Sequence, residues 1–137
     1  DIIVYGRIPL MVSAQCLAKT SAGGMNTYHN KTSDEPCCLV GTDRLELVDR
    51  FDKSFQIRRH CRECYNTIYN SQCLSLLHNK EQVLGLKTNH IRLHFTFESP
   101  EETKDVIDRF IQKYRYHNDQ VEEIKDYTRG HFNRGIE

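Results

Sequence analysis

The sequence lacks an excess of charge of either sign, because 19 Lys and Arg residues balance 19 Asp and Glu residues. Domains dedicated to nucleic-acid binding usually carry a clear basic excess, so the balance argues against that class. A local basic patch at Arg58, Arg59, His60 and Arg62 stays a candidate. The sequence also contains no apolar run as long as a membrane span and no recognisable signal peptide. We therefore expect a cytoplasmic protein with no membrane partner.

Two motifs of hydrolytic enzymes are also missing, since the chain contains neither HExxH nor GxSxG. Its 137 residues have the length of one ordinary domain, so we expect a single segment over 1–137. The chain begins with the strand-like residues 1–5 and without an initiator Met. We therefore expect a segment of a longer protein.

Cysteine is the residue type that carries the strongest chemical signal. Cys61 and Cys64 are three residues apart, which is the spacing of a half-site for zinc or an iron–sulfur cluster. Without a secretory signal, the six cysteines favour metal ligands over disulfides. Four thiolates close such a site, and the candidates are Cys16, one of Cys37 and Cys38 (with Cys38 preferred), Cys61 and Cys64. Cys73 lies in an apolar stretch, where we expect a buried small side chain.

A catalytic Cys–His pair is the competing chemistry. Cys61 follows His60 directly, and further histidines stand at positions 78, 90, 94 and 131. Sequence neighbours rarely have the geometry of a catalytic pair, and no nucleophile signature surrounds any cysteine, so we favour metal binding. His94 alternates with apolar residues, and we interpret it as a strand histidine rather than a catalytic one.

The part of the sequence before residue 90 predicts several strands and two short helices. Alternation on both sides of a polar turn predicts a β-hairpin from 45–49 and 55–58, directly followed by Cys61. Further strands are predicted over 2–5, ended by Gly6, and over 66–71. A short helix is predicted over 80–86, another short helix could start at 15–19, and 20–36 is predicted to be a long loop.

Residues 90–116 predict a strand–helix unit. The strand is expected over 91–97, and Ser99 and Pro100 then supply an N-cap and a favourable first helical residue. Apolar residues continue at helical spacing at Val106, Ile107, Phe110, Ile111 and Tyr114. The tail over 127–135 is basic and predicted to be irregular, and we expect it to dock through Tyr127 and Phe132 rather than to bind phosphate or RNA.

Several of these motifs together resemble one known family. They are VYGRIPLMVSAQC at 4–16, LVDR at 47–50 with Phe55, CxxCYN at 61–66, IYNS at 68–71, LSL at 74–76, the strand 91–97 with Glu98, and YTRGHFNRG at 127–135. In this order they resemble the U-32 peptidase (collagenase-like protease) family. The resemblance implies an α/β (α+β mixed) fold, namely the C-terminal portion of a TIM-barrel-like domain. A cysteine-bearing insertion with a β-hairpin would occupy 16–73.

The resemblance also implies a function. Family members are described as proteases, that is hydrolases, while several relatives resemble oxygen-independent hydroxylases that act on RNA bases or on a quinone precursor. Those relatives hold an iron–sulfur cluster on four cysteines, which implies a [4Fe–4S] cluster on Cys16, Cys37 or Cys38, Cys61 and Cys64. Cys73 departs from the family pattern and is not expected to be a ligand. A zinc-stapled structural or binding module without catalysis is the alternative.

The partners follow from the same resemblance. The longer parent protein would be an enzyme, with RNA or protein as its substrate. This segment alone would be inactive, because barrel active sites draw residues from many strand ends. Its partner would be the rest of the barrel, and its exposed sheet edges would favour self-association.

Overall fold

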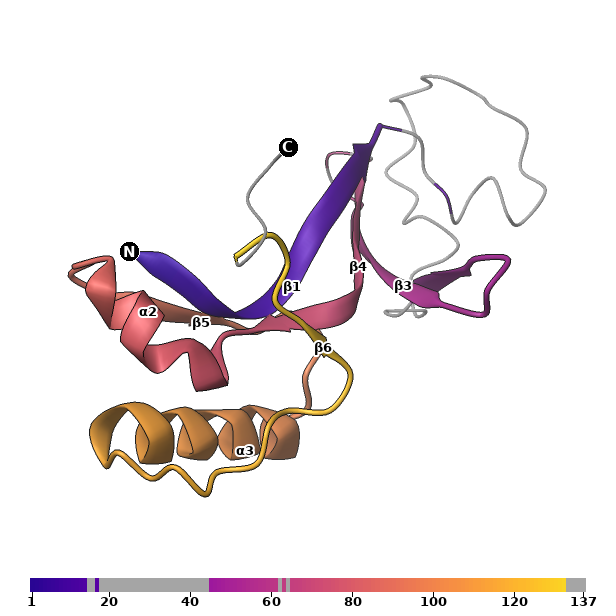
Figure 1. Cartoon of the computed structure of the whole chain (residues 1–137). Helices are drawn as coiled ribbons and strands as arrows, with labels where there is room; N and C mark the ends of the chain where they lie inside the picture. Colours follow the sequence, from indigo (N-terminus) through magenta and orange to yellow (C-terminus); the bar gives the residue numbers. More distant parts are fainter. Residues whose placement is uncertain (15–16, 18–44, 62, 64, 133–137) are drawn as a thin grey trace. The chain divides into compact units, whose positions relative to one another are not determined.

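The computed structural model describes residues 1–14, 17, 45–61, 63 and 65–132, which form a mixed α+β fold (Figure 1). The described elements are β1 (Ile2–Ser13), β2 (Leu45–Val48), β3 (Ser54–His60), β4 (Tyr65–Ser75), the short helix η1 (Leu77–Asn79), α2 (Lys80–Gly85), β5 (Ile91–His94), α3 (Pro100–Phe110), the π-type turn η2 (Ile111–Arg115) and β6 (Tyr127–Thr128). The strands form one mixed sheet in the order β2-β3-β4-β1-β5, and β6 pairs with β4. The α+β character is therefore as predicted.

The chain divides into two compact units. The first unit comprises Asp1–Ile8 and Gln72–Glu137, and the second comprises Pro9–Ser71. Strands β1 and β4 each contribute residues to both units. The predicted helix start at 15–19 and the predicted loop at 20–36 lie outside the described residues, apart from Leu17.

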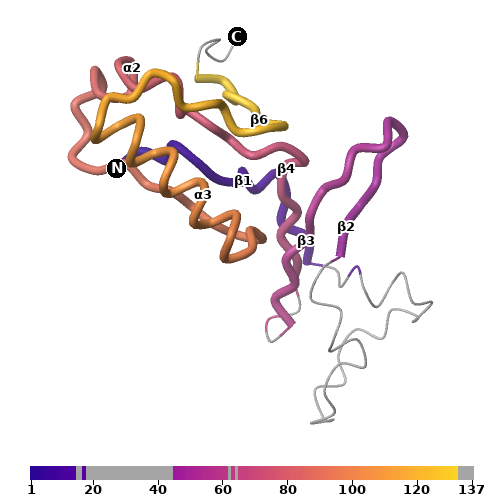
Figure 2. The backbone as a smooth tube through the Cα atoms, turned by 90° about the horizontal axis from the view of Figure 1, so that it is seen from below, coloured from indigo at the N-terminus to yellow at the C-terminus, as the bar shows by residue number. Residues whose placement is uncertain are grey.

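The core of the first unit joins strands to both helices. Val4 and Tyr5 from β1 pack with Val83 from α2 and with Val106 and Phe110 from α3, and Cys73, Leu76 and Leu77 complete the buried cluster. Phe132 from the tail packs against the same cluster. Docking of the tail through Phe132 is therefore confirmed, but the tail is not wholly irregular, because β6 runs parallel to the end of β4 (Figure 2).

Helix α3 begins where the sequence predicts. The Ser99 side chain accepts a hydrogen bond from the backbone N–H of Glu102, and the Glu102 carboxylate accepts one from the backbone N–H of Ser99. This reciprocal capping box satisfies two N–H groups that would otherwise lack partners. Val106 and Phe110 are buried as predicted, whereas Ile111 is 40% exposed. The wider π-type turn that begins at Ile111 changes which side chains face the core.

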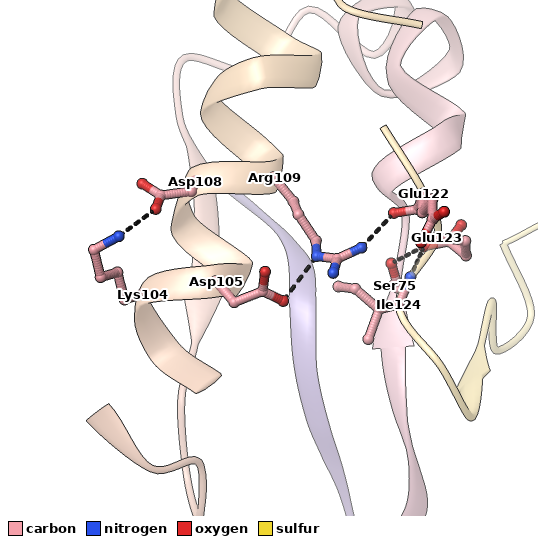
Figure 3. A network of polar contacts seen from close by, with 8 residues as sticks. All are labelled: Ser75, Lys104, Asp105, Asp108, Arg109, Glu122, Glu123 and Ile124. Atoms are coloured by element: carbon pink, nitrogen blue, oxygen red, sulfur yellow. Dashed lines mark hydrogen bonds and ion pairs between the residues drawn. The ribbon is translucent and has the colours of Figure 1, made fainter. Parts of the chain in front are cut away.

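A polar network connects the segment after α3 to the rest of the first unit (Figure 3). Arg109 forms an ion pair with Asp105, and its Nη1 donates to the carbonyl oxygen of Glu122 at 2.9 Å. The Ser75 hydroxyl, at the end of β4, donates to Glu123 Oε1 at 2.9 Å. These bonds hold residues 122–123 against both α3 and β4.

Strand β1 does not end at Gly6 as predicted but continues to Ser13. Gly6 pairs with His94 of the parallel strand β5, and its φ of 144° lies in a region that side chains with a Cβ rarely adopt. The register shifts between Ile3 and Tyr5, so Val4 forms a bulge in β1. Gly6 therefore permits close strand pairing rather than ending the strand.

Strand β5 ends at His94, earlier than the predicted end at Phe97. The Glu98 Oε2 atom accepts hydrogen bonds from the backbone N–H groups of Thr96, at 2.6 Å, and Phe97, at 3.0 Å. Because the Glu98 carboxylate takes up these two donors, the backbone turns before the helix cap at Ser99. At Thr96 and Phe97, hydrogen bonds to the Glu98 side chain take the place of the strand pairing that the sequence predicts.

The predicted hairpin of the second unit is confirmed, with β2 and β3 antiparallel from Leu45↔Ile57 to Val48↔Ser54 (Figure 2). Its turn is built by Asp49, whose Oδ1 accepts from the backbone N–H groups of Phe51, at 2.8 Å, and Lys53, at 2.9 Å. An Asp side chain that binds nearby backbone donors is typical of such turns.

Candidate functional site

The structure describes one of the five predicted ligand cysteines. Cys61 directly follows β3 and is exposed. Cys16, Cys37, Cys38 and Cys64 lie outside the described residues. Among the residues that the structure describes, no three His, Cys, Asp or Glu side chains form a group that could hold a metal ion. The four-thiolate site therefore stays a prediction, and the hairpin that carries Cys61 is its described part.

This cysteine hairpin consists of β3, β4 and their connection. The two strands are antiparallel, and the pairing extends from Ile57↔Ile68 to His60↔Tyr65. Because His60 and Tyr65 are paired, only residues 61–64 connect the strands, and this connection is the CxxC sequence. Two thiolates three residues apart in sequence are the spacing of a metal half-site, and here that spacing falls between two paired strands.

The base of this connection is fixed by side-chain contacts. The His60 ring stacks on the Tyr65 ring, with 4.1 Å between the centroids and 11° between the planes. His60 Nε2 also lies 3.2 Å from the Thr67 hydroxyl. Both contacts join β3 to β4 beside Cys61. His60 therefore contributes to the packing of the hairpin.

The predicted basic patch is divided by the strand. Arg58 is exposed, Arg59 is half-buried, and Ile57 before them is buried. Successive side chains of a strand point to opposite faces, so Arg58 and Arg59 do not share a face of β3. Arg62 lies outside the described residues. Arg58 is thus the described arginine that the hairpin exposes most clearly.

Cys73 is buried on β4, as predicted, and belongs to a polar cluster that the sequence did not predict. Its Sγ lies 3.8 Å from Glu98 Oε1, and the Tyr5 hydroxyl donates to the same oxygen at 3.2 Å. Burial is the largest cause that raises the pKa of the Cys73 thiol, and burial also raises the pKa of the Tyr5 phenol. A thiolate is the form that binds metals and attacks substrates, so the protonated Cys73 is a packing residue.

The remaining histidines of the competing Cys–His prediction are spread over the first unit. His78, His90, His94 and His131 are all exposed. His94 lies in β5, which confirms its interpretation as a strand residue. His78 also lines a polar pocket, together with Lys80, Lys113 and His117. Sequence patterns gave no signal for this pocket, because its lysines look like ordinary solvated charges.

Comparison with known proteins adds no identification. No protein-family model, curated protein or solved structure matches the chain. The resemblance to the U-32 family therefore rests on the sequence motifs alone. None of the helices in the described part of the chain has the length and apolar character needed to cross a bilayer.

Proposed function

We propose that the cysteine hairpin supplies two thiolate ligands of a metal centre, and that this centre is an iron–sulfur cluster. The observation that carries the proposal is the His60↔Tyr65 pairing, which makes the CxxC sequence the connection of a β-hairpin. Hairpins of this kind present two thiolates in many metal sites. Cys61 is an exposed residue at the end of β3. Cys16 and Cys38, or Cys37 in its place, would complete the site.

We further propose that the chain is the C-terminal part of a U-32-like protein with a TIM-barrel-like domain. The parallel pairing of β1 with β5, followed by helix α3, supports this, because barrels are built from parallel strands joined through helices. In the longer protein the cluster would serve hydroxylation or RNA modification. This chain contains neither HExxH nor GxSxG, so a peptidase activity would depend on other parts of the longer protein.

Metal analysis of anaerobically purified protein tests the centre. We expect brown protein with visible charge-transfer absorption and with iron and sulfide bound. The variant Cys61→Ser should lose the bound iron. The matched control Cys73→Ala should keep it, because Cys73 is buried beside Glu98 in a different cluster. Circular dichroism of both variants separates loss of a ligand from loss of the fold.

Two results would overturn the proposal. Colourless protein that takes up no iron during anaerobic reconstitution would rule out the cluster. Stoichiometric zinc without iron, together with unfolding by a chelator, would instead establish the zinc-stapled module. Cleavage of gelatin or casein by the protein that contains this chain would favour the peptidase alternative.

A further inference from the structure

The polar pocket lies entirely within the first unit and has a volume of about 430 Å³. It is lined on one side by residues of η1 and α2 and on the other by η2 and the segment that follows it. The lining residues are His78, Asn79, Lys80, Glu81, Gln82, Lys113, His117 and Asp119. Pockets of this size hold small molecules or ions, and the lining here is charged rather than apolar.

Lys80 is the central feature of the pocket. It is 5% exposed, and its Nζ lies 2.7 Å from Nδ1 of His117. An ammonium group can only donate, so Nδ1 of His117 accepts this hydrogen bond and the imidazole proton is on Nε2. Among the residues that the structure describes, no carboxylate forms an ion pair with Lys80. Lysine is rarely buried without a charged partner, so a bound anion would stabilise the buried Lys80 ammonium group.

The Asp119 carboxylate of the pocket is already engaged by the second lysine. Lys113 Nζ lies 2.6 Å from Asp119 Oδ1, and this hydrogen bond is the largest cause that lowers the pKa of Asp119. The charge of Lys80 lowers it further. Glu81 also lines the pocket, but it is exposed and takes part in no ion pair that the structure describes. The positive charge of Lys80 is therefore left over after Lys113 and Asp119 are paired.

We propose that this pocket is a binding site for a small oxyanion of the phosphate class, with Lys80 as its main ligand. An ammonium group has three N–H donors, and Lys80 uses one of them on His117. The other two can donate to phosphate oxygens, and charge-assisted bonds of this kind are about twice as strong as neutral ones. The proposal is independent of the cysteine hairpin, because none of the lining residues belongs to it.

Titration calorimetry with the 137-residue chain tests the site, with inorganic phosphate and glycerol phosphate as probes at constant ionic strength. We expect saturable binding that weakens about tenfold or more in Lys80→Met, since a bond to a charged group is lost. The control Lys104→Met removes the same charge from a side chain that is 79% exposed, and it should change the affinity less than about twofold. Tighter binding of glycerol phosphate would assign the site to phosphate esters, and equal binding would assign it to the free anion.

A second measurement needs no variant and so covers the case in which Lys80→Met does not fold. Amine acetylation of the unmodified chain, followed by peptide mass spectrometry, reports the reactivity of each lysine. Phosphate should slow the acetylation of Lys80 and leave that of Lys104 unchanged. Equal protection of both lysines, absence of saturable binding, or equal weakening by both substitutions would overturn the proposal.

Discussion

Replacing Gly6 by alanine should disrupt the pairing of β1 with β5. Gly6 faces His94 in the parallel ladder, and a Cβ added to Gly6 would lie 2.5 Å from the His94 carbonyl oxygen and 3.0 Å from the His94 Cβ. The favoured separation between carbon atoms in contact is about 3.5–4.0 Å, so both distances are too short. The obstructing oxygen belongs to the backbone, so rotation of a side chain cannot relieve the overlap.

Two costs add in this variant. A residue with a Cβ held at the φ of Gly6, 144°, carries backbone strain of about 1–3 kcal/mol. Forcing an extra methyl group into a packed site costs about another 1–3 kcal/mol. The sum of about 2–6 kcal/mol is a large fraction of the roughly 5–15 kcal/mol by which domains are stable. We therefore expect Gly6→Ala to fold poorly or to unfold at a much lower urea concentration.

Urea unfolding followed by circular dichroism measures the effect, and Gly85→Ala is the matched control. Gly85 is the last residue of α2, and a Cβ there would have no heavy atom within 4 Å. Gly85→Ala should leave the free energy of unfolding unchanged or raise it by up to about 1 kcal/mol, because alanine has a higher helix propensity than glycine. If the free energy of unfolding of Gly6→Ala lies within about 0.5 kcal/mol of that of the unmodified chain, the close approach of β1 and β5 is refuted.

Two further predictions concern the helix cap and the thiols. Ser99→Ala should lower the free energy of unfolding, measured in urea, by about 1 kcal/mol. Ser99→Asp can still accept the capping hydrogen bond and should lower it much less. Equal losses in the two variants would contradict a stabilising role of the Ser99 cap. In metal-free protein at pH 8, iodoacetamide should modify Cys61 quickly and Cys73 only after urea is added, because Cys73 is buried and its thiol pKa is raised. Peptide mass spectrometry checks this, and similar rates for both cysteines in the native protein would disprove it.

Local chemistry explains which elements the sequence could predict. The β2–β3 hairpin was recognisable because apolar and polar residues alternate on both sides of a polar turn, and Asp49 builds that turn within five residues of chain. The start of α3 was recognisable because Ser99 and Glu102 cap it within one turn. In both cases the residues that decide the structure are neighbours in sequence, so no knowledge of the tertiary fold was required.

The errors arose where a distant residue decides the outcome. A glycine can end a strand or permit close contact with a neighbouring one, and only the position of His94 shows that Gly6 does the latter. The two residues of β6 carry no periodic signal and become a strand only because β4 lies beside them. Lys80 and Lys113 both look like surface residues in sequence, since long charged side chains usually reach solvent. Their burial depends on how α2 and η2 are arranged.

Cys61 and Cys73 differ in burial, and this difference agrees with the predicted set of metal ligands. Cys61 lies in the connection between β3 and β4 and Cys73 lies within β4, yet Cys61 is exposed and Cys73 is buried with a raised thiol pKa. A count of cysteines in the sequence cannot make this distinction, because it depends on the position of Glu98 and on the packing around Tyr5. The burial of Cys73 agrees with its exclusion in the sequence analysis, which left five cysteines as candidates for a site that four thiolates would close. If Cys16, Cys61 and Cys64 are all ligands, as we propose, the fourth ligand comes from the adjacent pair Cys37 and Cys38.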